Sequence, residues 1–112
     1  MKKTGIELIA EERQRQIEVC GWTKEHDAEE HDNDSLAMAA ICYARPSNDR
    51  HYSYNPIIKA RVPDGWPWAA EDWKPTPENR VRELAKAGAL IAAEIDRINQ
   101  EIEISDDFRN HK

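Results

Sequence analysis

Apolar side chains recur at intervals of three and four residues in two stretches, one near each end of the chain. In the first stretch, the apolar positions between Gly5 and Cys20 and the charged Arg13 fall along one side of a helix. Thr4 and Glu7 have the spacing of a capping box, which satisfies free backbone amides at a helix start. The pattern therefore predicts a helix from Gly5 to Cys20.

The second stretch contains the most regular pattern in the sequence. Thr76 is suited to cap a helix and Pro77 to open it, and the apolar period continues to Ile102 or Ile104. No other predicted helix is long enough to cover the second half of this one, so we expect the protein to form a homo-oligomer through it. The spacing is that of a helix packing along a partner helix over three heptads, at Val81, Leu84, Gly88, Ile91, Ile95, Ile98 and Ile102.

A third and shorter helix is predicted over Ser35–Ala44. Asn33 or Asp34 is suited to cap its start, and Pro46 prevents its continuation. Small side chains dominate this segment, so another helix can approach it closely. We expect it to be a core helix.

The rest of the chain has no apolar period and is rich in turn-forming residues. Residues 46–75 form the longest such region, with a short strand or extended arm expected near Ile57–Val62. Together the elements predict an all-α fold: a small helical bundle with a long Trp-rich loop and a long C-terminal helix. We expect a single domain over residues 1–104, followed by a polar tail at residues 105–112.

Composition limits the classes of function. The chain has 112 residues, with 16 basic and 22 acidic side chains and a formal net charge of -6, which argues against non-specific binding to nucleic acid or to anionic membranes. No apolar run approaches the roughly 20 residues that span a bilayer, and the first residues turn acidic before a signal-peptide core could form. We expect a cytoplasmic protein. Cys20 and Cys42 are not a CxxC pair, and we interpret both as reduced packing residues.

Polar groups capable of chemistry are densest between the first two helices. Gly21 is suited to end the first helix, and Trp22 follows where an apolar side chain commonly folds back on the last turn. The acidic loop that comes next contains His26, Asp27 and His31. The two histidines are five positions apart, and no HExxH or HxH spacing appears, so we expect no metal. These residues are candidate ligand-binding groups, and the alternative is a solvated acidic loop.

Arg13 stands within an otherwise apolar helix face. An unpaired buried charge is costly, so its guanidinium must reach solvent, an acidic side chain or a ligand. One interpretation is a salt bridge to Asp27 or Asp34, and the other is a contact with a bound anion. Arg13 is the first candidate for an anion-binding residue.

Three indoles lie within eight positions in the loop before the last helix. Trp66, Trp68 and Trp73 either form a small packed cluster at the end of the bundle or provide a stacking surface for a planar ring. Lys74 and Arg80 follow closely enough to meet the phosphates of such a ligand. The two interpretations are compatible, with one Trp in the core and another in a pocket.

The chain resembles the ryanodine-receptor-type (RyR) domain over roughly residues 7–93. The resemblance rests on the Gly21-Trp22-Thr23 segment, the acids and His31 that follow, and the run ENRVRELAKAGALI in the last helix. The chain is also similar to small proteins encoded by phages and prophages, which share the GWT, EHD, WPW and KAGAL segments. The RyR resemblance implies a module that recognises nucleotide-like molecules. A phage origin implies that the protein acts in the host cytoplasm, for example by sequestering a signalling nucleotide.

A weaker resemblance is to the all-α MazG-type nucleotide pyrophosphohydrolases, which hold magnesium between acidic motifs on facing helices. Here Glu7 and Glu11 share a helix face, and Glu29 with Asp32 forms one ExxD, but the second acidic helix motif is missing. No catalytic constellation or cofactor is therefore assigned. The favoured function is binding of a nucleotide-like small molecule without turnover. The alternatives are a metal-dependent nucleotide pyrophosphohydrolase and a protein-interaction module that inhibits a host protein.

Overall fold

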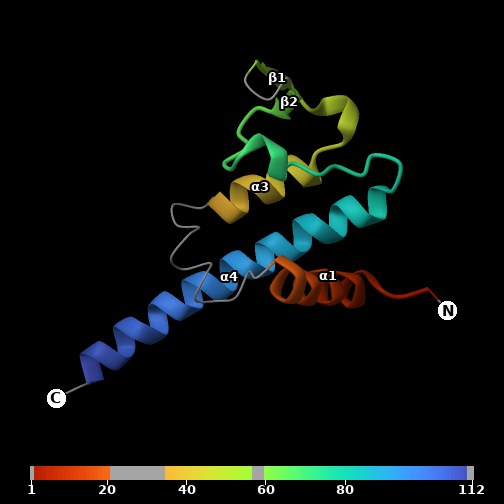
Figure 1. The fold of residues 1–112 in the computed structure, drawn as a ribbon. Coiled ribbons are helices and arrows are strands. Elements are labelled where there is room, and N and C mark those ends of the chain that lie inside the picture. The colour runs from red at the N-terminus through yellow and green to blue at the C-terminus, as the bar shows by residue number, and fades with distance from the viewer. Residues whose placement is uncertain (1, 21–34, 57–59, 111–112) are drawn as a thin grey trace.

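The computed structural model describes residues 2–20, 35–56 and 60–110 (Figure 1). This part of the chain is mostly helical, as predicted, but it also contains a small antiparallel sheet that an all-α fold does not include. In chain order the elements are α1 (Gly5–Cys20), α3 (Ser35–Ala44), the 3-10 turn η1 (Ser47–Asp49), β1 (Tyr52–Asn55), β2 (Ala60–Pro63), the 3-10 turn η2 (Ala70–Asp72) and α4 (Arg80–Asn110). No helix in these three ranges is long and apolar enough to cross a membrane.

Helix α1 begins and ends at the predicted residues. The amide of Thr4 donates to Glu7 Oε1 at 3.0 Å, and the amide of Glu7 donates to Thr4 Oγ1 at 3.2 Å. The backbone hydrogen bond from Thr4, followed by the one from its hydroxyl, lowers the pKa of Glu7. The predicted capping box is therefore confirmed.

Helix α4 begins three residues later and ends later than predicted. The Asn79 side-chain oxygen accepts from the amide of Arg82 at 3.1 Å, so Asn79 is the capping residue, and Thr76 lies in the turn before it. At the other end the helix continues past Ile104 to Asn110. Beyond Arg80 the sequence contains no proline, and its only glycine lies well inside the helix, so no residue forces an earlier end.

Helix α4 is the element on which the other two described helices pack (Figure 1). Helix α3 and α4 contribute many alanines to their contact, which lets the two backbones approach closely. As predicted, α3 is a core helix. The buried apolar core comprises Leu36, Ala39, Ala40, Cys42, Tyr43, Trp73, Ala87, Leu90 and Ala93.

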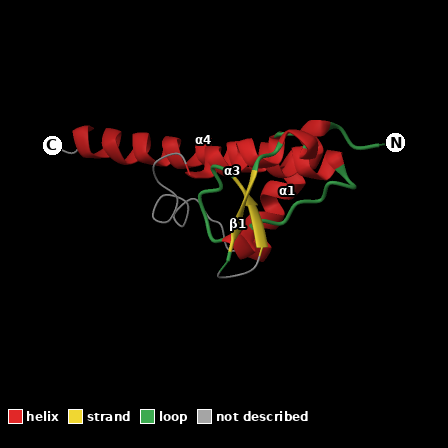
Figure 2. Cartoon of the chain, turned by 90° about the horizontal axis from the view of Figure 1, so that it is seen from above, coloured by secondary structure: helices red, strands yellow, loops and turns green. Residues whose placement is uncertain are grey.

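Helix α1 approaches α4 at Gly88. A Cβ placed on Gly88 would lie 2.5 Å from Ile9 Cδ1, closer than side-chain atoms can pack, so the absence of a side chain there makes room for Ile9. Farther along, α4 extends beyond both partner helices toward the C-terminus (Figures 1 and 2). The last turns of α4 therefore have neither α1 nor α3 beside them.

The two strands form an antiparallel hairpin after α3. Tyr52 pairs with Pro63 and Tyr54 with Arg61. The predicted strand near residues 57–62 overlaps β2, whereas β1 was not predicted; residues 57–59 lie outside the described part of the chain. Four residues are too short a run to reveal a strand by alternation alone.

Candidate functional site

The candidate site lies at the C-terminal end of α3. The last carbonyls of a helix have no partner within the helix and require outside donors. Arg50 donates through Nε to the Cys42 carbonyl at 3.0 Å and through Nη2 to the Tyr43 carbonyl at 3.1 Å. Arg80 donates through Nη1 to the Tyr43 carbonyl at 3.0 Å and also reaches the Ala44 carbonyl. Two guanidinium groups therefore cap α3, where positive charge is favourable.

Glu83, in the first turn of α4, is the counter-charge for both arginines. Its Oε2 lies 3.1 Å from Arg50 Nη2, and its Oε1 lies 3.4 Å from Arg80 Nη1. Burial favours a neutral carboxyl, but the hydrogen bond and charge of Arg50 outweigh it and lower the pKa of Glu83. Burial also opposes the charge on Arg50, yet hydrogen bonds with Glu83 and Tyr52 raise its pKa. Both groups are held in their charged forms.

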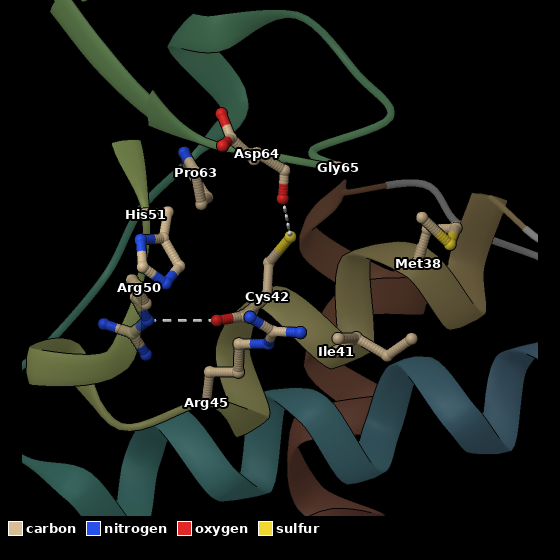
Figure 3. A pocket seen from close by; sticks show the side chains of 9 residues that line it. All are labelled: Met38, Ile41, Cys42, Arg45, Arg50, His51, Pro63, Asp64 and Gly65. Atoms are coloured by element: carbon tan, nitrogen blue, oxygen red, sulfur yellow. Dashed lines mark hydrogen bonds between the residues drawn. The ribbon is translucent and has the colours of Figure 1, made fainter. Parts of the chain in front are cut away.

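A pocket of about 450 Å³ lies between α3 and the hairpin (Figure 3). Met38 and Ile41 contribute an apolar wall from α3, and Figure 3 shows His51 and Pro63 across from them. The remaining side chains combine two arginines at one end with an acid at the other. The full lining is Met38, Ile41, Cys42, Arg45, Arg50, His51, Pro63, Asp64 and Gly65.

Three nitrogen-bearing side chains line this pocket. Arg45 and His51 are exposed, whereas Arg50 is buried and held by the α3 carbonyls. Arg50 Nη1 is buried and has no hydrogen-bond partner among the residues that the structure describes. Arginine is the side chain best suited to hold phosphate or carboxylate oxygens, because its planar fork donates two hydrogen bonds at once. The pocket thus combines arginine side chains at one end with an apolar wall.

The other groups in the pocket have structural contacts. The Asp64 carboxylate accepts a hydrogen bond from Ser53 Oγ, and Gly65, with φ of 87°, makes the turn that brings this segment over α3. The thiol of Cys42 lies 3.9 Å from the Asp64 carbonyl. Burial raises the pKa of Cys42 despite the nearby charges of Arg45 and Arg50. Cys42 is a buried free thiol, consistent with the predicted packing role.

Arg13, the first candidate for an anion-binding residue, lies elsewhere. It is buried, and its Nη2 is 3.4 Å from Asp96 Oδ2 on α4. A salt bridge was one of the two predicted interpretations, but the described partner is an acid of the last helix. The side chains of Asp27 and Asp34 lie outside the described residues.

The three tryptophans of the loop pack against one another and α3. Trp73 is buried, with its ring centroid 4.6 Å from that of Tyr43 and 5.1 Å from that of Trp66. Trp66 and Trp68 are half-buried and meet edge to face at 5.4 Å. Arg50 lies over the Trp73 ring at 5.3 Å. This arrangement matches the packed-cluster interpretation, and the pocket between α3 and the hairpin is lined by none of the three.

The two cations predicted to accompany the indoles have different surroundings. Lys74 is exposed, and its backbone is held by the Tyr43 hydroxyl at 3.1 Å and by Lys86 Nζ at 2.7 Å. Arg80 is engaged at the end of α3. The remaining candidates, Trp22, His26, Asp27 and His31, lie outside the described residues.

Sequence reasoning missed Arg45, Arg50 and His51. They stand in a proline-bounded region without periodicity, so only the packing of the hairpin on α3 brings them together. A weak signal exists at Arg45, which directly follows the last residue of α3, because a basic residue near the C-terminus of a helix interacts favourably with the free carbonyls.

Within residues 2–20, 35–56 and 60–110 no group of three His, Cys, Asp or Glu side chains is arranged to hold a metal ion. Comparisons with protein-family models, curated proteins and solved structures gave no significant match.

Proposed function

We propose that the protein binds a small nucleotide-like anion in the pocket between α3 and the hairpin, without turning it over. The observation that carries the proposal is the placement of Arg45, Arg50 and His51 beside the apolar wall of Met38 and Ile41. Arginine donors suit phosphate oxygens, and an apolar wall suits the face of a base.

The dimensions of the pocket agree with this class of ligand. Its volume of about 450 Å³ falls within the roughly 300 to 1,000 Å³ typical of small-molecule sites. The resemblance to the RyR-type domain supports the same ligand class. In a phage-type protein, such binding would sequester a signalling nucleotide of the host.

The chemistry of the two arginines favours holding a ligand over transforming it. Arginine keeps its proton at physiological pH, so it cannot act as a general acid or base there. Arg50 is further fixed by Glu83 and by the carbonyls of α3, which gives it one geometry before any ligand arrives. A preorganised donor loses little entropy on binding.

The direct test is a calorimetric titration with mononucleotides, cyclic nucleotides and dinucleotides. Arg45→Ala removes an exposed pocket residue, and we expect it to weaken binding roughly tenfold or more, because a hydrogen bond to a charged group contributes about 1.5 to 3 kcal/mol. Arg61→Ala, on an exposed residue of β2 outside the pocket, is the matched control. The proposal fails if no nucleotide binds, or if the two variants lose affinity equally.

A second candidate is a magnesium-dependent nucleotide pyrophosphohydrolase. The observation in its favour is a second pocket, of about 320 Å³, whose lining includes Glu11, Glu12, Arg15 and Arg82. Carboxylates are the ligands that magnesium prefers. In this structure Glu12 is already engaged, since its Oε1 lies 2.6 Å from Arg15 Nη2.

Chromatography of nucleotides after incubation with magnesium or manganese separates the two functions. Recovery of intact nucleotide excludes turnover, and the titration then shows whether the nucleotide is bound. Multiple turnovers that disappear in Glu11→Ala would establish the pyrophosphohydrolase instead.

A further inference from the structure

Helix α4 has three sides with different surroundings. One side, which includes Ala87, Leu90 and Ala93, is buried in the core with α3. A second side meets α1, where Ile9 lies against Gly88 and Arg13 reaches Asp96. The third side carries a row of large apolar side chains that are 40 to 61% exposed, here called the apolar stripe: Val81, Leu84, Ile91, Ile95, Ile98 and Ile102.

The stripe is unusual for its length and regularity. Its members follow the three-and-four spacing of a helix that pairs with another helix, except between Leu84 and Ile91, where the intervening position is Gly88 against Ile9 of α1. Each leaves on the order of 100 Å² in water, so the row exposes roughly 600 Å², at the upper limit of the largest apolar patch on a typical monomer. Scattered apolar residues on a surface need no explanation, but six large apolar side chains aligned along one helix do.

We propose that a second copy of this chain covers the apolar stripe, with α4 of one copy packed along α4 of the other. A stripe that pairs with its own copy through a two-fold axis is self-complementary, so both copies bury the same residues. The two stripes together would remove about 1,200 Å² from water, which exceeds the roughly 1,000 Å² expected of a biological interface.

Within the described part of the chain, the arrangement of the helices leaves room for this partner. Helix α4 continues beyond α1 and α3 in both views, so its C-terminal part has neither of these helices beside it (Figures 1 and 2). The stripe spans both this protruding part and the part that α1 and α3 contact, and it reaches from Val81 to Ile102. A long helix from a second copy matches this extent, whereas α1 and α3 are 16 and 10 residues long.

The experiment is light scattering of the full chain after size exclusion, from about 1 to about 100 µM. For a chain of 13.0 kDa, we expect the mass of a dimer. Ile95→Glu places a charge in the middle of the stripe and should shift the mass to that of a monomer, because an unpaired buried charge is costly. Ile6→Glu is the matched control: Ile6 is 82% exposed on α1, outside the stripe, and its replacement should leave the dimer intact.

Two further measurements keep the result interpretable. Circular dichroism must show that Ile95→Glu is folded; if it is not, the milder Ile98→Ala should raise the dissociation constant at least tenfold while remaining helical. The melting temperature of the unaltered chain should rise with its concentration, as mass action requires of a dimer.

A monomer at every concentration overturns the proposal and leaves the stripe to a different protein partner. A dimer that persists in folded Ile95→Glu also overturns it, because the interface would then lie on another face. Neither result bears on nucleotide binding, which the titration of Arg45→Ala tests separately.

Discussion

Arg50 and Glu83 form an ion pair in the interior of the protein, with Nη2 and Oε2 3.1 Å apart and each side chain 1% exposed. The pair joins the segment after α3 to the first turn of α4. Glu83 also accepts a hydrogen bond from the Thr76 amide at 3.1 Å, so the loop that precedes α4 is held by the same carboxylate. Removing two charges from water is costly, so such a pair adds little net stability, whereas removing one partner leaves an uncompensated buried charge.

Glu83→Gln should destabilise the fold strongly. The neutral amide leaves the charge of buried Arg50 without a counter-charge, and breaking a buried pair by removing one partner costs about 3 to 5 kcal/mol. Urea denaturation measures the loss in the free energy of unfolding. The control is Glu78→Gln, at an exposed residue just before α4. This substitution should change the free energy of unfolding by less than about 0.5 kcal/mol. A loss below about 1 kcal/mol in Glu83→Gln would contradict the role assigned to the pair.

The free energy of unfolding should decrease at acidic pH because of Glu83. Arg50 keeps the pKa of Glu83 below its unfolded value, so the folded state binds the proton less readily than the unfolded state does. The stabilisation is complete above the unfolded pKa of about 4.5 and is lost as the pH falls through the lower, folded pKa. Denaturation between neutral pH and this acidic range checks the slope. The difference between the unaltered chain and Glu83→Gln should shrink there, and a constant difference would argue against the linkage.

Gly88→Ala should destabilise the contact between α1 and α4. The new Cβ would lie 2.5 Å from Ile9 Cδ1 and 2.7 Å from Ile9 Cγ1, so α1 or the isoleucine must move. Overpacking of this kind costs about 1 to 3 kcal/mol, against roughly 1 kcal/mol gained from the higher helix propensity of alanine. Thermal denaturation of Gly88→Ala, of Ile9→Ala and of the double variant forms a mutant cycle. We expect the double variant to be more stable than the sum of the single effects predicts, and strict additivity would rule out the close approach.

Arg13→Ala should affect stability and leave the pocket unchanged. Arg13 is buried against Asp96 of α4 and does not line the pocket between α3 and the hairpin, so its loss removes a contact between helices. A lower melting temperature with unaltered nucleotide affinity of the folded protein is the expected result. The opposite result, lower affinity with unchanged melting, would return Arg13 to the role of ligand-binding residue. Arg45→Ala, with its exposed side chain, should show the reverse pattern and serves as the comparison.

The limits of sequence reasoning are clearest where two local signals compete. Thr76 with Pro77, and Asn79 three residues later, are both suited to start the last helix, and the structure uses Asn79. The backbone amide of Thr76 is instead bound by Glu83. That contact depends on where Glu83 is held, and Glu83 is held by Arg50, 33 positions earlier in the chain. A local pattern cannot contain this information.

The difference between local patterns and contacts of distant residues also decides which parts of the fold and the site could be predicted from the sequence. The spacing of apolar residues with Thr4 and Glu7 predicted α1, and the capping residues before Ser35 with Pro46 after the helix predicted α3, because these signals act within a few positions of each other along the chain. The spacing of apolar residues also marked the apolar stripe of α4, whose exposure is visible only once α1 and α3 are in place. The pocket was decided by tertiary structure alone: Arg45, Arg50 and His51 become neighbours of Met38 and Pro63 because the hairpin folds back onto α3. Within this pocket Arg50 is held by an ion pair with Glu83, a residue distant in the sequence.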